Sequence, residues 1–517
     1  MSSKDINDIL QEKGNAGVLA AMDAMLEDID IDAEKAATAA AQKEKEAAEK
    51  VAAEKDLMNS FISKPLEDQD NADRLNSMCG NEIRWDLDSE NWFLYEGGVW
   101  RPHGNSNSVL LPYTRRVSDF IKSHYQQSKN SVAVSLGENL YRKWKKRKTQ
   151  FNAIELLKGI RSILITQADL DKNPMLLNCK NGVVDLETGK LMQAAPELLL
   201  TKQCNAAYIP NAPAPLFESF MQQILPDEET REAVLRYLGY CLTALTVEEK
   251  VFFAYGTGGN GKGSLLGTIQ TLLGDYSTAF KIGVLLKQKY GVNPDAASPE
   301  IAKLNRVRIA IVSESKDVRK FDTATLKDLT GGDIITARAM YQQPISFNPT
   351  HKFFLQGNNL PSPENINDTG FLRRFYIIKF LQKFTEEAAN LHLKADLVTA
   401  DSLNGILALL VKYCLKWQRE GLLISSDMKA AKAEYIDENN FVAEFISDNC
   451  ELVQGAYIKR KDFISRLREE KHISDKQYKD KDLVSMIAAI DGITYDKTAD
   501  KNKSNAFFGV KWIEPAE

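Results

Sequence analysis

The chain has 517 residues, of which 44% are hydrophobic and 26% charged, and its net charge at pH 7 is −5. This length predicts about three domains, and the charge excludes a polycation that binds nucleic acid over its whole surface. No run reaches the roughly 18 apolar residues of a membrane span. The start of the chain, at residues 1–5, lacks an apolar signal segment. We therefore expect a cytoplasmic protein without a membrane partner.

Residues 1–70 differ in composition from the rest of the chain. Ala, Glu and Lys dominate residues 33–55, which predicts a polar helical extension or linker. A coiled-coil arm is the alternative, but it needs leucines at a and d positions that this stretch lacks. The six cysteines are scattered without a Cys-x-x-Cys pair, a pattern typical of free thiols rather than of disulfides or a zinc site.

Residues 71–205 are predicted to form a mixed α+β domain with helices. Turn residues at 96–98 follow an aromatic cluster and indicate a hairpin, helical periodicity follows at 113–125, and residues 176–190 fit two short strands. Residues 141–148 combine six Lys and Arg with two aromatic residues. This run favours either phosphate contact with base stacking or a solvated helix face, and both interpretations stay open.

A glycine-rich segment lies between an apolar run at 250–255 and a helical pattern at 265–273. It consists of Gly256, Thr257, Gly258, Gly259, Asn260, Gly261, Lys262, Gly263 and Ser264. Strand, glycine-rich loop, lysine and helix predict a loop whose backbone N–H groups hold phosphates, with Lys262 at the β and γ phosphates. The usual hydroxyl ligand for magnesium directly follows the lysine, whereas here Gly263 stands there and Ser264 comes next. A glycine turn with a surface lysine is the alternative.

Three further apolar runs, at 308–314, 351–358 and 375–380, predict strands separated by helices. This alternation indicates an α/β fold with a mainly parallel sheet and ligands at the carboxyl ends of the strands. Glu314 ends the first of these runs, where a metal-binding or water-polarising acid belongs, and Asn358 ends the second. Arg373 and Arg374 precede the third, where one of them could stabilise the transition state.

After residue 380 the pattern is helical, and a connector is predicted over 386–436. Residues 437–517 form a candidate C-terminal module. Helical patterns at 441–452, 459–468 and 481–490 precede two predicted strands at 493–497 and 506–512. Three helices and a hairpin predict a winged helix, in which Lys501 and Lys503 of the connecting loop would contact DNA. Contact with another protein is the alternative.

Five segments, in this order, resemble the superfamily 3 DNA helicases found in primase-helicase proteins of phages, satellite phages, plasmids and poxviruses. They are residues 256–264, 311–314, 327–338, 353–361 and 371–375. The resemblance implies a AAA+ core over 206–385 that binds ATP and Mg²⁺ and forms a hexameric ring around DNA. It makes Glu314 the Walker B acid, Asn358 sensor 1, and Arg374 the finger that acts on a neighbouring subunit's ATP.

The resemblance also implies a hairpin that projects into the ring channel. Its arms would be residues 335–340 and 345–347, and Arg338, Tyr341 and Gln342 would contact DNA. A Lys-His tip is familiar in viral relatives, whereas the tip of this chain has no lysine.

These observations predict an ATP-dependent replicative DNA helicase of a mobile element in the host cytoplasm. The resemblance implies that it forms a ring and moves 3′ to 5′. Its expected partners are single- and double-stranded DNA, further copies of the chain, and a separate primase or host replication proteins. The first alternative is an origin-binding initiator ATPase that assembles on DNA and melts it without processive unwinding. The second is a AAA+ switch that does not translocate.

Overall fold

The computed structural model describes residues 42, 45, 47–287, 298–313, 320–340, 343–364, 366, 368–384, 392–475, 478–497 and 505–513. The chain divides into two compact units. The first unit extends to residue 167 without residues 96–100, and the second comprises 96–100 and everything from 168 onward. In the described residues, no helix is both long and apolar enough to cross a membrane. The predicted domain boundaries stay predictions.

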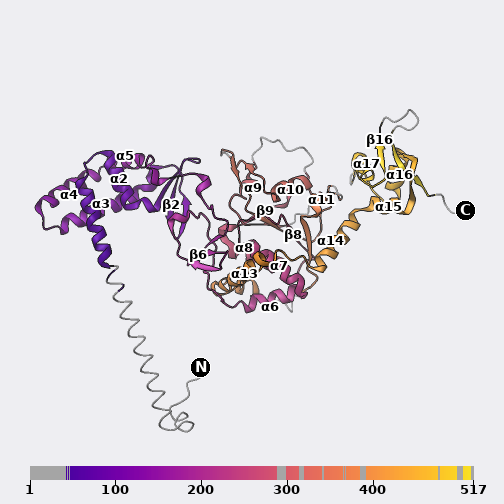
Figure 1. Cartoon of the computed structure of the whole chain (residues 1–517), viewed down its shortest axis with the longest axis horizontal. Coiled ribbons are helices and arrows are strands. Elements are labelled where there is room, and N and C mark those ends of the chain that lie inside the picture. Colours follow the sequence, from indigo (N-terminus) through magenta and orange to yellow (C-terminus); the bar gives the residue numbers. More distant parts are fainter. Residues whose placement is uncertain are drawn as a thin grey trace, which may run out of the picture. The chain divides into compact units, whose positions relative to one another are not determined.

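Helices dominate the first unit. A helix over 47–63 is followed by α2 (Asp68–Cys79), β1 (Ile83–Asp86), β2 (Asn91–Glu96), β3 (Val99–Pro102), α3 (Leu111–Gln127), α4 (Ser131–Trp144), α5 (Arg147–Leu157) and β4 (Leu164–Ile165) (Figure 1). The four strands form one sheet in the order β3-β2-β1-β4, in which the last residue of β2 and the first two residues of β3 fall within the 96–100 segment of the second unit. Met58 and Phe61, from the end of the stretch predicted to be a polar linker, are buried in the core of this unit.

One aromatic residue of the basic run is unavailable to a ligand. The side chain of Trp144 is fully buried, and its indole Nε1 donates a hydrogen bond of 2.7 Å to the carbonyl oxygen of Thr114. The expectation that Trp144 could stack on a nucleic-acid base is therefore wrong, because core packing uses its whole ring.

The second unit contains a five-stranded, all-parallel sheet. Its strands are β8 (Val251–Tyr255), β9 (Ser277–Lys281), β10 (Ile309–Ser313), β13 (Lys352–Gly357) and β14 (Phe375–Lys379), in the spatial order β14-β8-β13-β10-β9. The predicted α/β class and parallel sheet are confirmed. The strand order puts β8, which leads into the glycine-rich loop, between β13 and β14.

Both faces of this sheet are buried, which explains its unbroken apolar runs. In β8, Phe252 and Ala254 pack into one core cluster, whereas Val251 and Phe253 pack into the other. Residues from α6, α7, α8 and α13 belong to the first cluster, and residues from α10, α11 and α14 belong to the second. The helices of the unit are α6 (Pro215–Ile224), α7 (Glu228–Tyr240), α8 (Lys262–Leu273), α9 (Pro299–Ala302), α10 (Thr323–Thr330), α11 (Thr369–Leu372), α12 (Leu393–Asp396), α13 (Ala400–Glu420) and α14 (Ser426–Asn439).

Two smaller sheets belong to the same unit. Strands β5 (Leu176–Cys179), β6 (Gly182–Asp185) and β7 (Lys190–Met192) form an antiparallel meander over the stretch where two strands were predicted. Strands β11 (Ile335–Ala337) and β12 (Ile345–Phe347) pair antiparallel. The paired arms of the predicted hairpin are thus confirmed, whereas Tyr341 and Gln342 lie outside the described residues.

The C-terminal segment has a core of its own. It comprises α15 (Phe441–Asn449), β15 (Cys450–Lys459), α16 (Arg460–Glu470), α17 (Asp480–Ala488), β16 (Thr494–Asp496) and β17 (Ala506–Trp512), with sheet order β15-β17-β16 (Figure 1). The three helices and the last two strands occur where predicted. The sequence interpretation missed β15, and it extended the first helix to residue 452 although that helix ends at Asn449. Lys501 and Lys503 lie outside the described residues.

Candidate nucleotide-binding site

The glycine-rich loop joins the carboxyl end of β8 to the first residue of α8, as the sequence predicted. Two of its glycines are required by geometry. Gly256 has φ of 155°, and a Cβ there would collide with the carbonyl oxygen of Phe380. Gly261, the N-cap of α8, has φ of 83°, and a Cβ there would collide with Ile224 of α6. The loop is therefore folded tightly between Phe380, which directly follows β14, and α6, and larger residues cannot replace these glycines without strain.

Lys262 lies inside this loop. Lys262 is only 6% exposed to solvent. Its ammonium donates hydrogen bonds to the carbonyl oxygen of Gly256 and to Asn260 Oδ1, the latter at 3.1 Å. Asn260 is also buried, and its Nδ2 donates to the carbonyl oxygen of Phe380 at 3.2 Å. The cation is thus positioned by acceptors that the loop itself supplies, at the N-terminus of α8, where positive charge accumulates.

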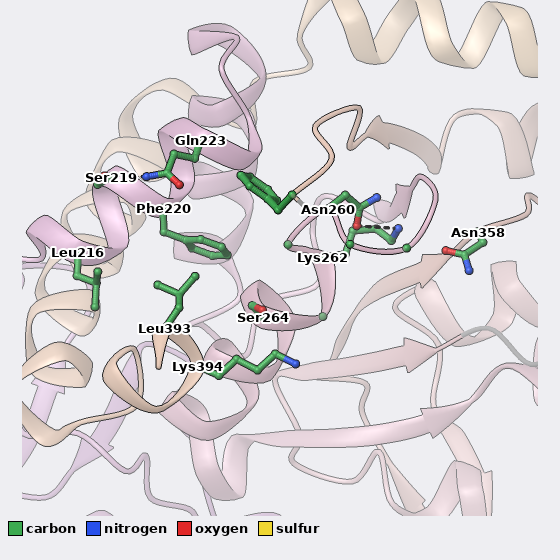
Figure 2. A pocket seen from close by; sticks show the side chains of 15 residues that line it. Leu216, Ser219, Phe220, Gln223, Asn260, Lys262, Ser264, Asn358, Leu393 and Lys394 are labelled. Atoms are coloured by element: carbon green, nitrogen blue, oxygen red, sulfur yellow. Dashed lines mark hydrogen bonds between the residues drawn. The ribbon is translucent and has the colours of Figure 1, made fainter. Parts of the chain in front are cut away.

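A cavity of about 660 Å³ opens beside the loop. Its lining includes the loop from Gly258 to Ser264 and the side chain of Asn358, which directly follows β13. Figure 2 shows Asn358 on one side of the loop and the α6 residues on the other. Since β13 pairs with β8 in register up to Gly357 and Tyr255, the position of Asn358 follows from the strand order. The structure therefore brings together the loop, Ser264 and Asn358.

The far side of the cavity is apolar and was not predicted from the sequence. Leu216 and Phe220 come from α6 and Leu393 from α12, and they lie on the same side of the pocket in Figure 2. Gln223 and Ser219 add polar groups there, with a 3.3 Å hydrogen bond between their side chains. The amphipathic pattern of α6 indicated burial, but no local signal indicated that this face would meet the loop. An apolar end with a few polar groups is typical of a small-molecule pocket.

The metal-ligand position remains a prediction. Gly263, which follows the lysine, has no side-chain oxygen, and a Cβ there would meet nothing within 4 Å. Ser264 lines the cavity one residue further along α8. Glu314 directly follows β10 but lies outside the described residues. In the part of the chain that the structure describes, no cluster of three or more His, Cys, Asp or Glu residues that could hold a metal ion occurs.

Arg374 is not at the cavity. Its backbone carbonyl accepts a hydrogen bond from the N–H of Val251, the first residue of β8, so Arg374 lies at the amino end of the sheet. Five residues of β8 separate that end from the loop, a distance of about 16 Å at 3.3 Å per residue. The side chain is buried and pairs with Glu249 at 2.7 Å. Arg373, whose side chain is 62% exposed, pairs with the same carboxylate.

Of the residues predicted to contact DNA, Arg338 alone lies among the described residues. It follows β11 and is exposed. Its backbone N–H donates to Ser298 Oγ at 3.3 Å, and its carbonyl oxygen accepts from the Ser298 N–H at 2.8 Å. These bonds fix the end of the first hairpin arm next to α9.

Two family models match the chain. Residues 72–226 match the D5 N terminal like family, and residues 254–374 match a family of unknown function, DUF5906. A "Putative helicase L207/L206" of Acanthamoeba polyphaga mimivirus is 28% identical over 404 residues, which cover 69% of this chain and 42% of the relative. A "Putative primase C962R" of African swine fever virus (isolate Warthog/Namibia/Wart80/1980) is 24% identical over 310 residues, covering 53% and 32%.

These matches fit a D5-like primase-helicase family. The predicted resemblance to primase-helicase proteins is thereby confirmed. The matched segments span only 42% and 32% of the length of these two relatives. Among solved structures, the apo C-terminal region of NrS-1 is similar with a TM-score of 0.44 and 12% identity, covering 80% of this chain and 83% of that one.

Proposed function

We propose that this protein is an ATP-dependent replicative DNA helicase of superfamily 3 with a AAA+ core, which works as a hexameric ring and moves 3′ to 5′. One observation carries the proposal. The glycine-rich loop opens, at the carboxyl edge of a parallel sheet, into a cavity that also holds Asn358 and an apolar end. This is the arrangement that a nucleoside triphosphate requires, with phosphates at the loop and the base at the apolar end. Relatives named helicases support it.

The residues present fit ATP with Mg²⁺. The loop N–H groups and Lys262 would hold the phosphates, and Ser264 Oγ, which lines the cavity, would provide an oxygen ligand for the metal together with Glu314. The bound metal neutralises charge on the β and γ phosphates during transfer. Asn358 lines the cavity on the side of the loop opposite α6. Its side-chain amide would contact the γ-phosphate end of the nucleotide. The apolar face of α6 and α12 would hold the base and exclude water from it.

The position of Arg374 supports action between subunits. At about 16 Å from the loop of its own chain, Arg374 can serve an ATP site only if that site belongs to another copy. A ring in which the amino edge of one sheet faces the cavity of the next copy satisfies this requirement. The Glu249 pair would hold the guanidinium until the neighbouring nucleotide competes for it.

The proposed DNA contacts come from two places. The hairpin β11–β12 would carry Arg338 and, at its tip, Tyr341 and Gln342 to single-stranded DNA in the ring channel. The C-terminal module, with three helices and a three-stranded antiparallel sheet, would act as a winged helix whose loop places Lys501 and Lys503 on duplex phosphates.

The decisive experiment measures ATP hydrolysis with and without single-stranded DNA, alongside unwinding of forks with a 3′ or a 5′ tail. Lys262→Ala should abolish both activities, whereas Lys412→Ala, at an exposed position of α13 outside the cavity lining, should change neither. Hydrolysis that ignores DNA, with no fork opened, would refute the helicase and leave a AAA+ switch. DNA-stimulated hydrolysis with local melting at specific sites only would instead favour the initiator ATPase.

Subunit mixing tests the role of Arg374. Lys262→Ala and Arg374→Ala subunits should each be inactive alone. Mixed together, they should regain activity, because an intact loop on one subunit then meets an intact Arg374 on its neighbour. Recovery also proves that both variants are folded. Mixtures that stay inactive, although wild-type subunits are shown to exchange into the same rings, would refute action in trans, and Arg373→Ala serves as the control.

A further inference from the structure

A run of four exposed cations, Lys145, Lys146, Arg147 and Lys148, lies in the first unit where α4 passes into α5, and we call it the α4–α5 cluster. Residues 141–158 hold seven Lys and Arg against one Glu, although the whole chain has a net charge of −5. Among the described residues, no carboxylate forms an ion pair with any of the four: the neighbouring pair Arg142–Glu138 and the pair Lys158–Glu155 involve other cations. None of the four cations is thus held in an ion pair by a carboxylate of the described residues.

The cluster lies at the N-terminus of α5, where positive charge is electrostatically unfavourable unless an anion is bound. α5 starts at Arg147, its N-cap Lys146 makes no side-chain cap, and its first turn contains no acidic residue. Cations at a helix N-terminus oppose the helix dipole. The first N–H groups of a helix also lack acceptors within the helix. A bound anion would offset the charge that the four cations place at this end of α5.

Buried anchors on both sides hold the cluster in place. Trp144 is fully buried directly before it, with its indole bound to the carbonyl oxygen of Thr114 at 2.7 Å. Thr149 is 7% exposed directly after it, and Ala153 and Ile154 continue into the core. The four side chains therefore project from a turn whose backbone is fixed at both ends, rather than from a mobile tail, so a ligand need not first order the chain.

The aromatic residues near the cluster are already used. Trp144 is in the core, and Tyr141 is half-buried with the Lys145 ammonium 5.3 Å from its ring centre. Phe151 is half-buried with the Arg147 guanidinium at 5.1 Å. Single-strand binding relies on exposed aromatic rings that stack on bases, and residues 141–158 offer none. Recognition at this surface must therefore come from charge alone.

We propose that the α4–α5 cluster binds the phosphate backbone of duplex DNA without reading its sequence. This contact lies in the first unit and is separate from the hairpin and C-terminal contacts proposed above. Such a contact would hold the unopened duplex. It stands on the charge and packing of the first unit and does not depend on ATP hydrolysis by the second.

The test compares two four-site variants of the full chain. In the first, the residues of the α4–α5 cluster are changed: Lys145→Gln, Lys146→Gln, Arg147→Gln and Lys148→Gln. The matched control changes four other exposed lysines of the first unit by the same total charge: Lys50→Gln, Lys55→Gln, Lys122→Gln and Lys129→Gln. Binding to a short blunt-ended duplex and to an oligo-dT strand is measured over a range of salt concentrations, without nucleotide. Circular dichroism and thermal unfolding confirm the fold of both variants.

Four phosphate contacts contribute about 3.6 to the slope of log K against log salt, at 0.9 per contact with duplex. For duplex, the slope of the cluster variant should be smaller than the wild-type slope by about this amount. When salt rises fourfold, the affinity of the variant should therefore fall by a factor about 100 times smaller than that of the wild type. The control should keep the wild-type slope. An unchanged slope in the cluster variant, an equal loss in the control, or a loss seen only with oligo-dT would each overturn the proposal. An inactive motor would leave this result intact, since no step of the measurement uses ATP.

Discussion

Gly261→Ala and Gly263→Ala should have opposite effects on stability, although the two residues are only two positions apart. Gly261 has φ of 83°, and an alanine Cβ would lie under 3.0 Å from Ile224 Cγ2 and 3.4 Å from Phe220 Cε2. The left-handed backbone costs an alanine about 1–2 kcal/mol, and overpacking against α6 costs about 1–3 kcal/mol more. We expect a total loss of about 2–5 kcal/mol, a large part of a typical domain's stability.

Gly263 is in the first turn of α8, and a Cβ there meets nothing within 4 Å. Alanine at an unhindered helical position gains about 0.5–1 kcal/mol over glycine. Thermal unfolding and titration with a fluorescent ATP analogue measure both changes. Gly261→Ala should melt several degrees lower and lose nucleotide affinity, because α6 carries the apolar side of the cavity, whereas Gly263→Ala should melt at or above the wild-type temperature. A Gly261→Ala variant that melts and binds like wild type would refute the tight packing of this loop against α6.

Three further results are expected. Burial lowers the pKa of His351 to about 3, below its unfolded value near 6.5. The unfolded chain therefore binds one more proton between these pH values, and stability should fall as pH drops from 6.5 toward 3, by about 1.4 kcal/mol per pH unit. His351→Gln should lack this component in urea titrations, and an identical pH dependence would contradict it. Phe220→Leu should weaken ATP-analogue binding about fivefold to tenfold, because the lost ring contact is worth about 1–1.5 kcal/mol. Binding of inorganic tripolyphosphate, which has no base, should not change. Equal losses for both ligands would place the base elsewhere. Ser264→Ala should raise the Mg²⁺ concentration needed for hydrolysis, and adding Gly263→Ser should restore it, unless Ser264 is not the ligand.

Elements with a strong local pattern were predictable. The first four residues of each strand, 251–254 and 309–312, are apolar and buried because both faces of the sheet are covered, so hydrophobicity alone marked them. The loop between β8 and α8 was predictable because its glycines are required by backbone geometry that other residues avoid. Strand β15 was not predictable, since most of its residues are exposed and Gly455 interrupts it with φ of 85°. The residues of β15 do not show the alternation of polar and apolar side chains that marks a half-buried strand.

Residues whose environment depends on distant parts of the chain were mispredicted or missed. Trp144 stands among lysines and arginines in the sequence, yet the carbonyl oxygen of Thr114, 30 residues earlier, accepts its hydrogen bond in the core. Leu393 reaches the cavity from α12, more than 100 residues after the loop. A pattern over neighbouring residues carries no information about such encounters. Only the packing of α3 against α4, or of α12 beside α6, determines them.

The two catalytic candidates that flank strands of the sheet show how topology decides between them. Asn358 comes after β13 and Arg374 comes before β14, and both strands are hydrogen-bonded neighbours of β8. All three strands run in the same direction. A residue that follows a strand is therefore carried to the loop, and a residue that precedes one is carried to the opposite edge. The order and direction of the strands therefore put Asn358 at the cavity and Arg374 away from it, and this difference is why the mixed-subunit experiment can test the proposed role of Arg374.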